Sequence, residues 1–108
     1  MDPNDIDMIQ LQYPNVPSHT IEALENYWTR GWEPGSFLTA ALSGDLYQAA
    51  ARADKWNKDA LGHIAVYIAR EAPDGSWGSR NMVKDWCNRG DWFQRYEKQR
   101  VVDILSKP

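Results

Sequence analysis

Apolar residues recur at intervals of three and four positions along most of the chain, which is the spacing of one face of an α-helix. The first such face consists of Ile21, Leu24, Tyr27 and Trp28. Ser18 is the expected N-cap of this helix, and Gly31 supplies the left-handed residue at which such helices end. No segment alternates apolar and polar residues as a half-buried strand does. The pattern therefore predicts an all-α fold.

Prolines, glycines and capping residues divide the following part of the chain into further helices. Pro34 suits the first turn of a second helix, because the N–H that proline lacks has no partner there in any case. Ser43 or Asp45 is expected to cap a third helix. A fourth helix is predicted between the break at residues 54–57 and Pro73, since a proline disfavours helix in the residue before it. These helices are therefore expected to be short.

The two ends of the chain differ in character. Residues 1–17 contain three prolines and are predicted to form an irregular arm with at most one helical turn. Ser79 is expected to cap a fifth helix, and Asp91 with Gln94 forms a capping box for a last one. The inner face of that last helix consists of Trp92, Tyr96, Val101 and Leu105. We therefore predict an irregular arm over residues 1–17 and a single compact domain of five or six short helices over residues 18–108.

Composition narrows the class of protein without identifying a function. The chain has 108 residues, of which 43% are hydrophobic and 25% are charged, and these proportions are typical of one soluble globular domain. No apolar run approaches the length of a membrane-spanning helix. The net charge of −3 argues against general binding to duplex DNA, which requires a surplus of cations. Cys87 is the only cysteine, so an internal disulfide is excluded.

The sequence carries no arrangement that is typical of catalysis or metal binding. His19 and His63 are the only histidines, and no motif places either of them beside other ligands, so no metal is expected. Cys87 has no neighbouring histidine, and no serine lies in a nucleophile-elbow motif. We therefore expect a protein that is not an enzyme and that needs no cofactor.

The start of the second helix is one candidate for binding an anion. The N–H groups of residues 35–37 are unpaired at a positive helix end, and the Ser36 hydroxyl adds a further donor. Glu33 lies beside them and repels an anion. The structural alternative is an ordinary helix start.

A second candidate is the polar segment at residues 52–58. Arg52 offers a planar fork for a phosphate, and Asn57 can form hydrogen bonds with an amide-like edge. Trp56 or Tyr47 can stack on a base. The structural alternative is a capped helix junction with a surface ion pair between Arg52 and Asp54.

Aromatic residues are unusually frequent, with 6 Trp and 5 Tyr. Most of them fit the apolar faces of the predicted helices. Trp32 and Trp77 lie instead in predicted turns, where exposed tryptophans often serve interfaces because they bury a large area at low entropic cost. This excess favours a homo-oligomer.

Several short motifs occur in a fixed order between residues 20 and 86. They are Ala23-Leu24 with Tyr27, then Gly31-x-x-Pro34-Gly35-x-Phe37-Leu38-Thr39-Ala40-x-Leu42-Ser43-x-Asp45-Leu46, then Ala50-x-Arg52-Ala53-Asp54-x-x-Asn57, and finally Pro73-x-Gly75-x-Trp77-Gly78-Ser79 with Trp86. This series resembles a recurrent family of small proteins encoded by tailed bacteriophages. Ser36, Gly44 and Ser76 depart from the pattern of that family.

The resemblance implies a phage accessory protein that acts in the cytoplasm of an infected bacterium. In size, helical class and lack of catalytic residues, the chain is similar to the anti-CBASS sponges, which are phage proteins that sequester the cyclic oligonucleotide messengers of host immunity. The leading hypothesis is therefore a homo-oligomer that sequesters a nucleotide-type signal without catalysis. Its candidate ligand-binding residues are Arg52, Asn57, Thr39, Ser43, Tyr27 and Trp77, the last as a stacking lid.

Two other functions fit the same sequence. A phage inhibitor could bind a host protein directly, through an acidic and aromatic surface. An assembly factor of the phage particle needs no ligand pocket at all. The net charge of −3, the tryptophans in turns and the arm residues Ile9, Leu11 and Tyr13 favour the inhibitor.

Overall fold

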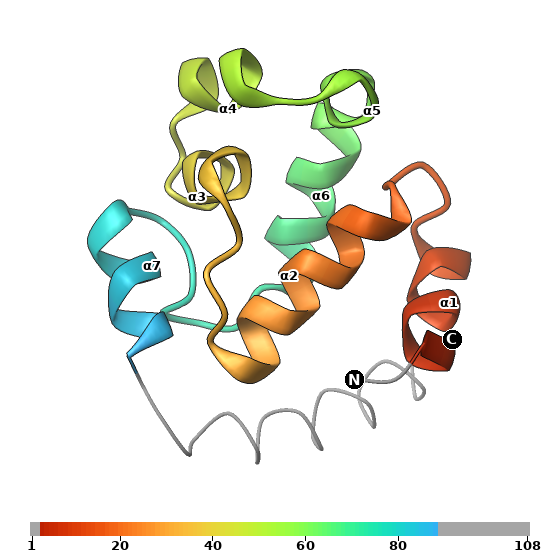
Figure 1. Cartoon of the computed structure of the whole chain (residues 1–108), viewed down its shortest axis with the longest axis horizontal. Helices are drawn as coiled ribbons and strands as arrows, with labels where there is room; N and C mark the ends of the chain where they lie inside the picture. The colour runs from red at the N-terminus through yellow and green to blue at the C-terminus, as the bar shows by residue number, and fades with distance from the viewer. Residues whose placement is uncertain (1–2, 89–108) are drawn as a thin grey trace.

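The computed structural model describes residues 3–88, which form seven α-helices and no strand (Figure 1). The helices are α1 (Pro3–Gln12), α2 (Ser18–Arg30), α3 (Ser36–Leu42), α4 (Leu46–Arg52), α5 (Lys55–Asp59), α6 (Leu61–Glu71) and α7 (Arg80–Cys87). The predicted all-α class is confirmed, but the described part alone has seven helices rather than five or six. The additional helices are α1 and α5, because α5 covers most of the break predicted at residues 54–57 and Ala60 separates it from α6.

Helix α2 lies at the centre of the fold, between α1 on one side and α7 on the other (Figure 1). The four residues predicted for its apolar face are fully buried: Ile21, Leu24, Tyr27 and Trp28. Helix α6 contributes Ile64 and Tyr67 to the same core, and α7 contributes Trp86. The Trp86 indole N–H donates to the Tyr27 carbonyl at 3.0 Å. A single core therefore fixes α7 against α2.

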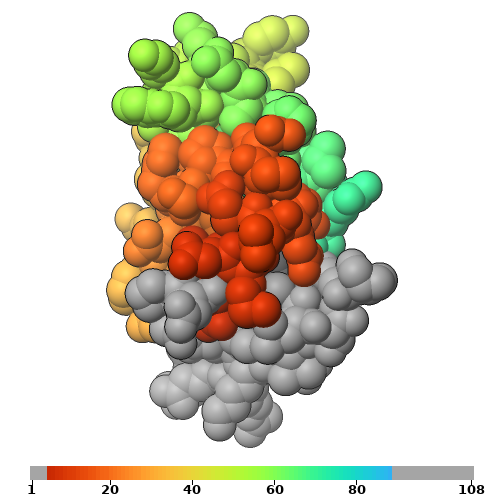
Figure 2. Space-filling view, turned by 90° about the vertical axis from the view of Figure 1, so that its right-hand side faces the viewer, coloured from red at the N-terminus to blue at the C-terminus, as the bar shows by residue number. Residues whose placement is uncertain are grey.

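The irregular arm predicted for residues 1–17 is wrong, because α1 occupies residues 3–12. Pro3 stands at the first position of α1, where proline is tolerated, so it begins a helix rather than preventing one. Ile9 is buried in the common core with 2% of its surface exposed. The Gln10 side-chain amide donates to the Val16 carbonyl at 2.6 Å and holds the turn into α2. In Figure 2, the red and orange N-terminal residues occupy the middle of one face.

Several predicted helix ends are confirmed, and two are shifted. Asp45, one of the two expected caps of the third helix, and the expected cap Ser79 each accept a hydrogen bond from the backbone N–H three residues further on. Asp54, at the predicted break, does the same. Pro17 and not Ser18 is the N-cap of α2, and Pro34 precedes α3 instead of lying in its first turn. The cap of α3 is Gly35, whose φ of 91° favours glycine. The last helix predicted from Asp91 and Gln94 lies outside the described residues.

We expect Ser79→Ala to destabilise the fold by about 1 kcal/mol, because the Ser79 hydroxyl accepts the Met82 N–H at 3.1 Å and caps α7. Ser18→Ala is the matched control, since no side-chain cap bond is formed at the start of α2. The free energy of unfolding in urea measures both variants. Equal losses in the two variants would contradict the capping role of Ser79.

Candidate functional site

Two of the predicted ligand-binding residues, Tyr27 and Asn57, point into the protein interior. Tyr27 has no exposed surface, and its hydroxyl donates to the Ser76 carbonyl at 2.7 Å. Asn57 is 6% exposed, and its side-chain oxygen accepts a hydrogen bond from the Thr20 hydroxyl. These two side chains join α2 to the turn at residue 76 and to α5. Neither side chain is among the lining residues of the two hollows described below.

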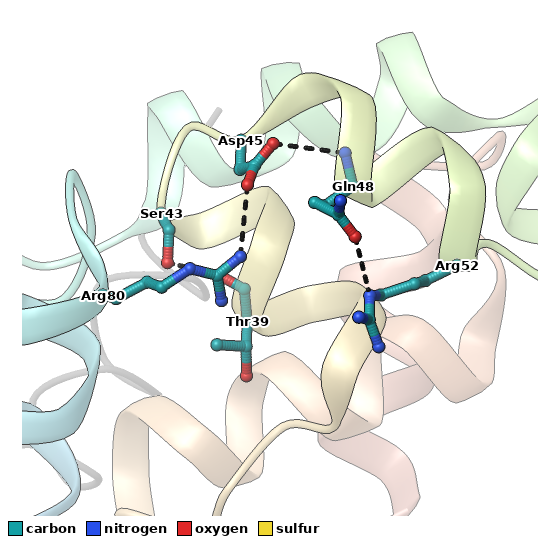
Figure 3. A network of polar contacts seen from close by, with 6 residues as sticks. All are labelled: Thr39, Ser43, Asp45, Gln48, Arg52 and Arg80. Carbon is teal, nitrogen blue, oxygen red and sulfur yellow. Dashed lines mark hydrogen bonds and ion pairs between the residues drawn. The ribbon is translucent and has the colours of Figure 1, made fainter.

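Arg52 lies on the exposed side of α4, where its Nε donates to the Gln48 side-chain oxygen at 3.1 Å (Figure 3). The surface ion pair between Arg52 and Asp54, which the sequence offered as the alternative to a ligand site, is not formed. Arg52 binds Gln48 on its own helix, and Asp54 lies 3.3 Å from His19 Nε2.

Thr39 and Ser43 are half-buried neighbours on one side of α3. The Ser43 hydroxyl donates to the Thr39 carbonyl at 2.5 Å, which is a local bond that ends the helix. Thr39 also lines a hollow of about 420 Å³ between α3 and α7, which we call the polar hollow. Its other lining residues are Glu33, Pro34, Gly35, Ser36, Arg80, Val83, Lys84, Cys87 and Asn88.

Two cations give the polar hollow its positive side. Arg80 and Lys84 are separated by four residues on α7, so they share one face of that helix. The Arg80 guanidinium lies 3.2 Å from the Asp45 carboxylate, which also caps α4 (Figure 3). Lys84 has no ion-pair or hydrogen-bond partner among residues 3–88. The hollow therefore presents one anchored cation and one cation that is available to a ligand.

The polar hollow is also lined by a carboxylate, that of Glu33, which lies in the connection between α2 and α3. Glu33 is exposed and lines the hollow together with Cys87. Burial raises the pKa of the Cys87 thiol, and the nearby charge of Glu33 raises it further. Because a protonated thiol is a weak nucleophile, Cys87 is unsuited to covalent chemistry at neutral pH.

A second, apolar hollow of about 280 Å³ lies between α3, α4 and α6. Its lining residues are Ala41, Leu42, Gly44, Leu46, Ala49, Leu61, Ile64, Ala65, Ile68, Trp77 and Gly78. Trp77 is 39% exposed at this hollow, as expected for a tryptophan in a turn. The Gly78 N–H donates to the Leu42 carbonyl at 2.8 Å, which joins the turn before α7 to the end of α3. Both hollows therefore border α3, but the turn before α7 lines only the apolar hollow, and α7 itself lines the polar hollow.

The structure separates the six predicted residues. Thr39 lines the polar hollow, Trp77 lines the apolar hollow, and the other four line neither. Arg80 and Lys84, the cations of the polar hollow, were not among the candidates. The available signal was the spacing of Arg80 and Lys84 directly after the Ser79 cap, which places two cations on one helix face.

Asp54 forms a polar cluster with His19 on the surface, away from the two hollows. The pKa of Asp54 lies below its ordinary value of 3.8, mainly because the Asn57 backbone N–H donates to it, and His19 lowers it further. The unfolded chain therefore binds this proton more tightly. The stability that the carboxylate contributes is complete above its unfolded pKa and is lost as the pH falls through the lower, folded pKa.

We expect Asp54→Asn to reduce the acid sensitivity of folding, because asparagine caps a helix without a titrating group. The free energy of unfolding should fall less between about pH 5 and about pH 2 in this variant than in the unmodified protein. Asp59→Asn, on the same helix, is the control and should keep the original pH dependence. Urea unfolding at each pH gives the measurement, and identical pH profiles would contradict the assignment.

The described residues contain no group of three or more His, Cys, Asp or Glu side chains that could hold a metal ion. None of their helices is long and apolar enough to cross a membrane. The comparisons with known protein families, with curated proteins and with solved structures give no significant match to this chain.

Proposed function

We propose that this protein is a non-catalytic binding protein that sequesters a small nucleotide-type ligand, with the polar hollow as the phosphate site. The observation that carries the proposal is the pair of cations, Arg80 and Lys84, in one hollow with the hydroxyl-bearing residues Ser36 and Thr39. A guanidinium and an ammonium both form charge-assisted hydrogen bonds with phosphate oxygens, and hydroxyl groups add neutral donors. The volume of about 420 Å³ is within the range of small-molecule sites.

The apolar hollow is the reason to propose a nucleotide rather than a simple anion as the ligand. A nucleotide carries an anionic phosphate and a flat apolar base, so a site for it needs both polar and apolar surface. Trp77 offers an exposed aromatic surface at the apolar hollow, which Gly78 also lines, while Arg80, two residues further along the chain, lines the polar hollow.

The biological setting of the proposal comes from the resemblance to small phage proteins. A protein without catalytic groups lowers the concentration of a signal only by binding it in stoichiometric amounts. Such a sponge would act in the host cytoplasm as a homo-oligomer and remove a nucleotide messenger of host immunity.

Native mass spectrometry of the purified full chain tests this function. The protein is incubated with linear and cyclic mononucleotides and dinucleotides, and the masses of the protein and of its complexes are recorded. The expected result is an oligomer that gains a defined number of unmodified nucleotides. If no nucleotide binds at concentrations up to about 1 mM, a range that corresponds to about 4 kcal/mol of binding free energy, the proposal is wrong.

Direct inhibition of a host protein is a second candidate, and the exposed residues of α4 favour it. Leu46, which lines the apolar hollow, is 63% exposed, and the next residue, Tyr47, is 85% exposed. Large apolar side chains that gather at a surface often mark interfaces. A stable complex with one host protein, formed without any nucleotide and abolished by Tyr47→Ala, would support this candidate over sequestration.

A further inference from the structure

The polar hollow contains a carboxylate that phosphate binding alone does not explain. Glu33 comes from the connection between α2 and α3, whereas the two cations come from α7. Among residues 3–88, Glu33 has neither an ion pair nor a hydrogen bond to another side chain. Its charge reaches the interior of the hollow, because it raises the pKa of the Cys87 thiol there. The hollow thus holds an acidic group that no cation of the described chain neutralises.

A carboxylate in a phosphate site lowers the affinity for an anion unless the ligand also offers hydrogen-bond donors. Two unit charges of like sign repel at close range, and this cost is larger in a partly enclosed hollow than in water. The cost is recovered when the carboxylate accepts N–H donors from another part of the same ligand, since hydrogen bonds to charged groups are the stronger class. The complementary ligand is therefore anionic at one end and a donor at the other.

Among the nucleobases, guanine matches a carboxylate best. Its ring N1–H and its exocyclic amino group lie side by side and donate in the same direction, so both oxygens of one carboxylate can accept. Adenine and cytosine place one amino group beside a ring nitrogen that is itself an acceptor and repels the second oxygen. Uracil has one N–H between two carbonyl acceptors. Only guanine thus makes a two-donor pair with an ionised carboxylate.

We propose that the polar hollow selects guanine nucleotides, with Glu33 accepting from the base edge while Arg80 and Lys84 hold the phosphate. The selectivity rests on the proposed nucleotide-binding function and adds the class of base to it. Pro34 and Val83 supply the apolar surface of the same hollow, against which a flat base can pack. Glu33 acts here as a specificity-determining residue.

The test compares GMP, AMP and inorganic phosphate as ligands of the full chain by isothermal titration calorimetry. We expect GMP to bind at least tenfold more tightly than AMP. In Glu33→Gln, GMP affinity should fall at least tenfold, whereas the affinity for inorganic phosphate should stay constant or rise, because the repulsion is gone. Opposite changes for two ligands cannot result from loss of folding. Glu22→Gln, an exposed substitution on α2 outside the hollow, is the matched control and should change neither affinity.

The outcomes separate this proposal from the function on which it rests. Equal affinity for GMP and AMP in the unmodified protein overturns guanine selectivity and leaves nucleotide binding standing. A preference for GMP that persists in Glu33→Gln overturns the role of Glu33. Failure of GMP, AMP and their cyclic dinucleotides to bind overturns the proposed function itself, even where inorganic phosphate binds.

Discussion

Replacing Arg80 and Lys84 together by alanine is expected to weaken nucleotide binding at least 100-fold. Each side chain would lose a charge-assisted hydrogen bond to phosphate, worth about 1.5–3 kcal/mol, and about 1.4 kcal/mol corresponds to a tenfold change in affinity. The fold should tolerate the change, because Arg80 is exposed and its pair with Asp45 is a surface ion pair worth at most about 1 kcal/mol. Calorimetric titration measures the affinity, and urea unfolding measures the stability.

Two further variants make this result specific to the polar hollow. Lys55→Ala with Lys58→Ala removes the same charge from α5, which does not line the hollow, so it controls for the change in net charge. Arg52→Ala tests the sequence-based candidate on α4. If the Arg52 variant loses affinity and the Arg80–Lys84 variant keeps it, the ligand binds at α4 and the polar hollow is not the phosphate site.

The helices that were predicted well are those whose ends carry a short-range chemical signal. Asp45 and Ser79 accept the backbone N–H three residues ahead, so the caps of α4 and α7 are decided by local sequence. The segment before Ser18 gave the opposite result, because the prolines suggested an irregular arm. Pro3 instead begins α1, and the burial of Ile9 in the core stabilises that helix. Tertiary packing is not readable from residue spacing alone.

Two of the residues predicted to contact a ligand are buried in the structure, which the sequence did not indicate. Hydrogen-bonding residue types suggested Asn57 and Tyr27 as ligand contacts, but the same groups can satisfy partners inside the protein. Asn57 pairs with Thr20, and the Tyr27 hydroxyl donates to Ser76. A buried polar group needs a partner, so a polar residue on an apolar helix face is as compatible with the core as with a ligand.

Arg80 and Lys84 are positioned by the packing of α7 against the core, and Trp86 is the buried residue of α7 whose loss is expected to reduce stability most. Trp86 has no exposed surface, lies with its ring centroid 6.3 Å from that of Tyr27, and donates its indole N–H to the Tyr27 carbonyl. We expect Trp86→Ala to destabilise the protein by about 3–5 kcal/mol, because it removes a large buried ring and leaves a cavity.

Trp86→Phe separates the two contributions of this side chain. Phenylalanine keeps most of the buried ring and removes the indole donor, and the Tyr27 carbonyl still accepts the Gly31 N–H, so the loss should be about 1–3 kcal/mol. Urea unfolding followed by circular dichroism measures both variants. Nucleotide binding gives a second comparison, because α7 carries Arg80 and Lys84 as well as Trp86. Trp86→Ala should lose stability and nucleotide binding together, whereas the Arg80–Lys84 variant should lose binding alone. A Trp86→Ala protein that unfolds within about 1 kcal/mol of the unmodified chain would contradict the anchoring of α7 by this residue.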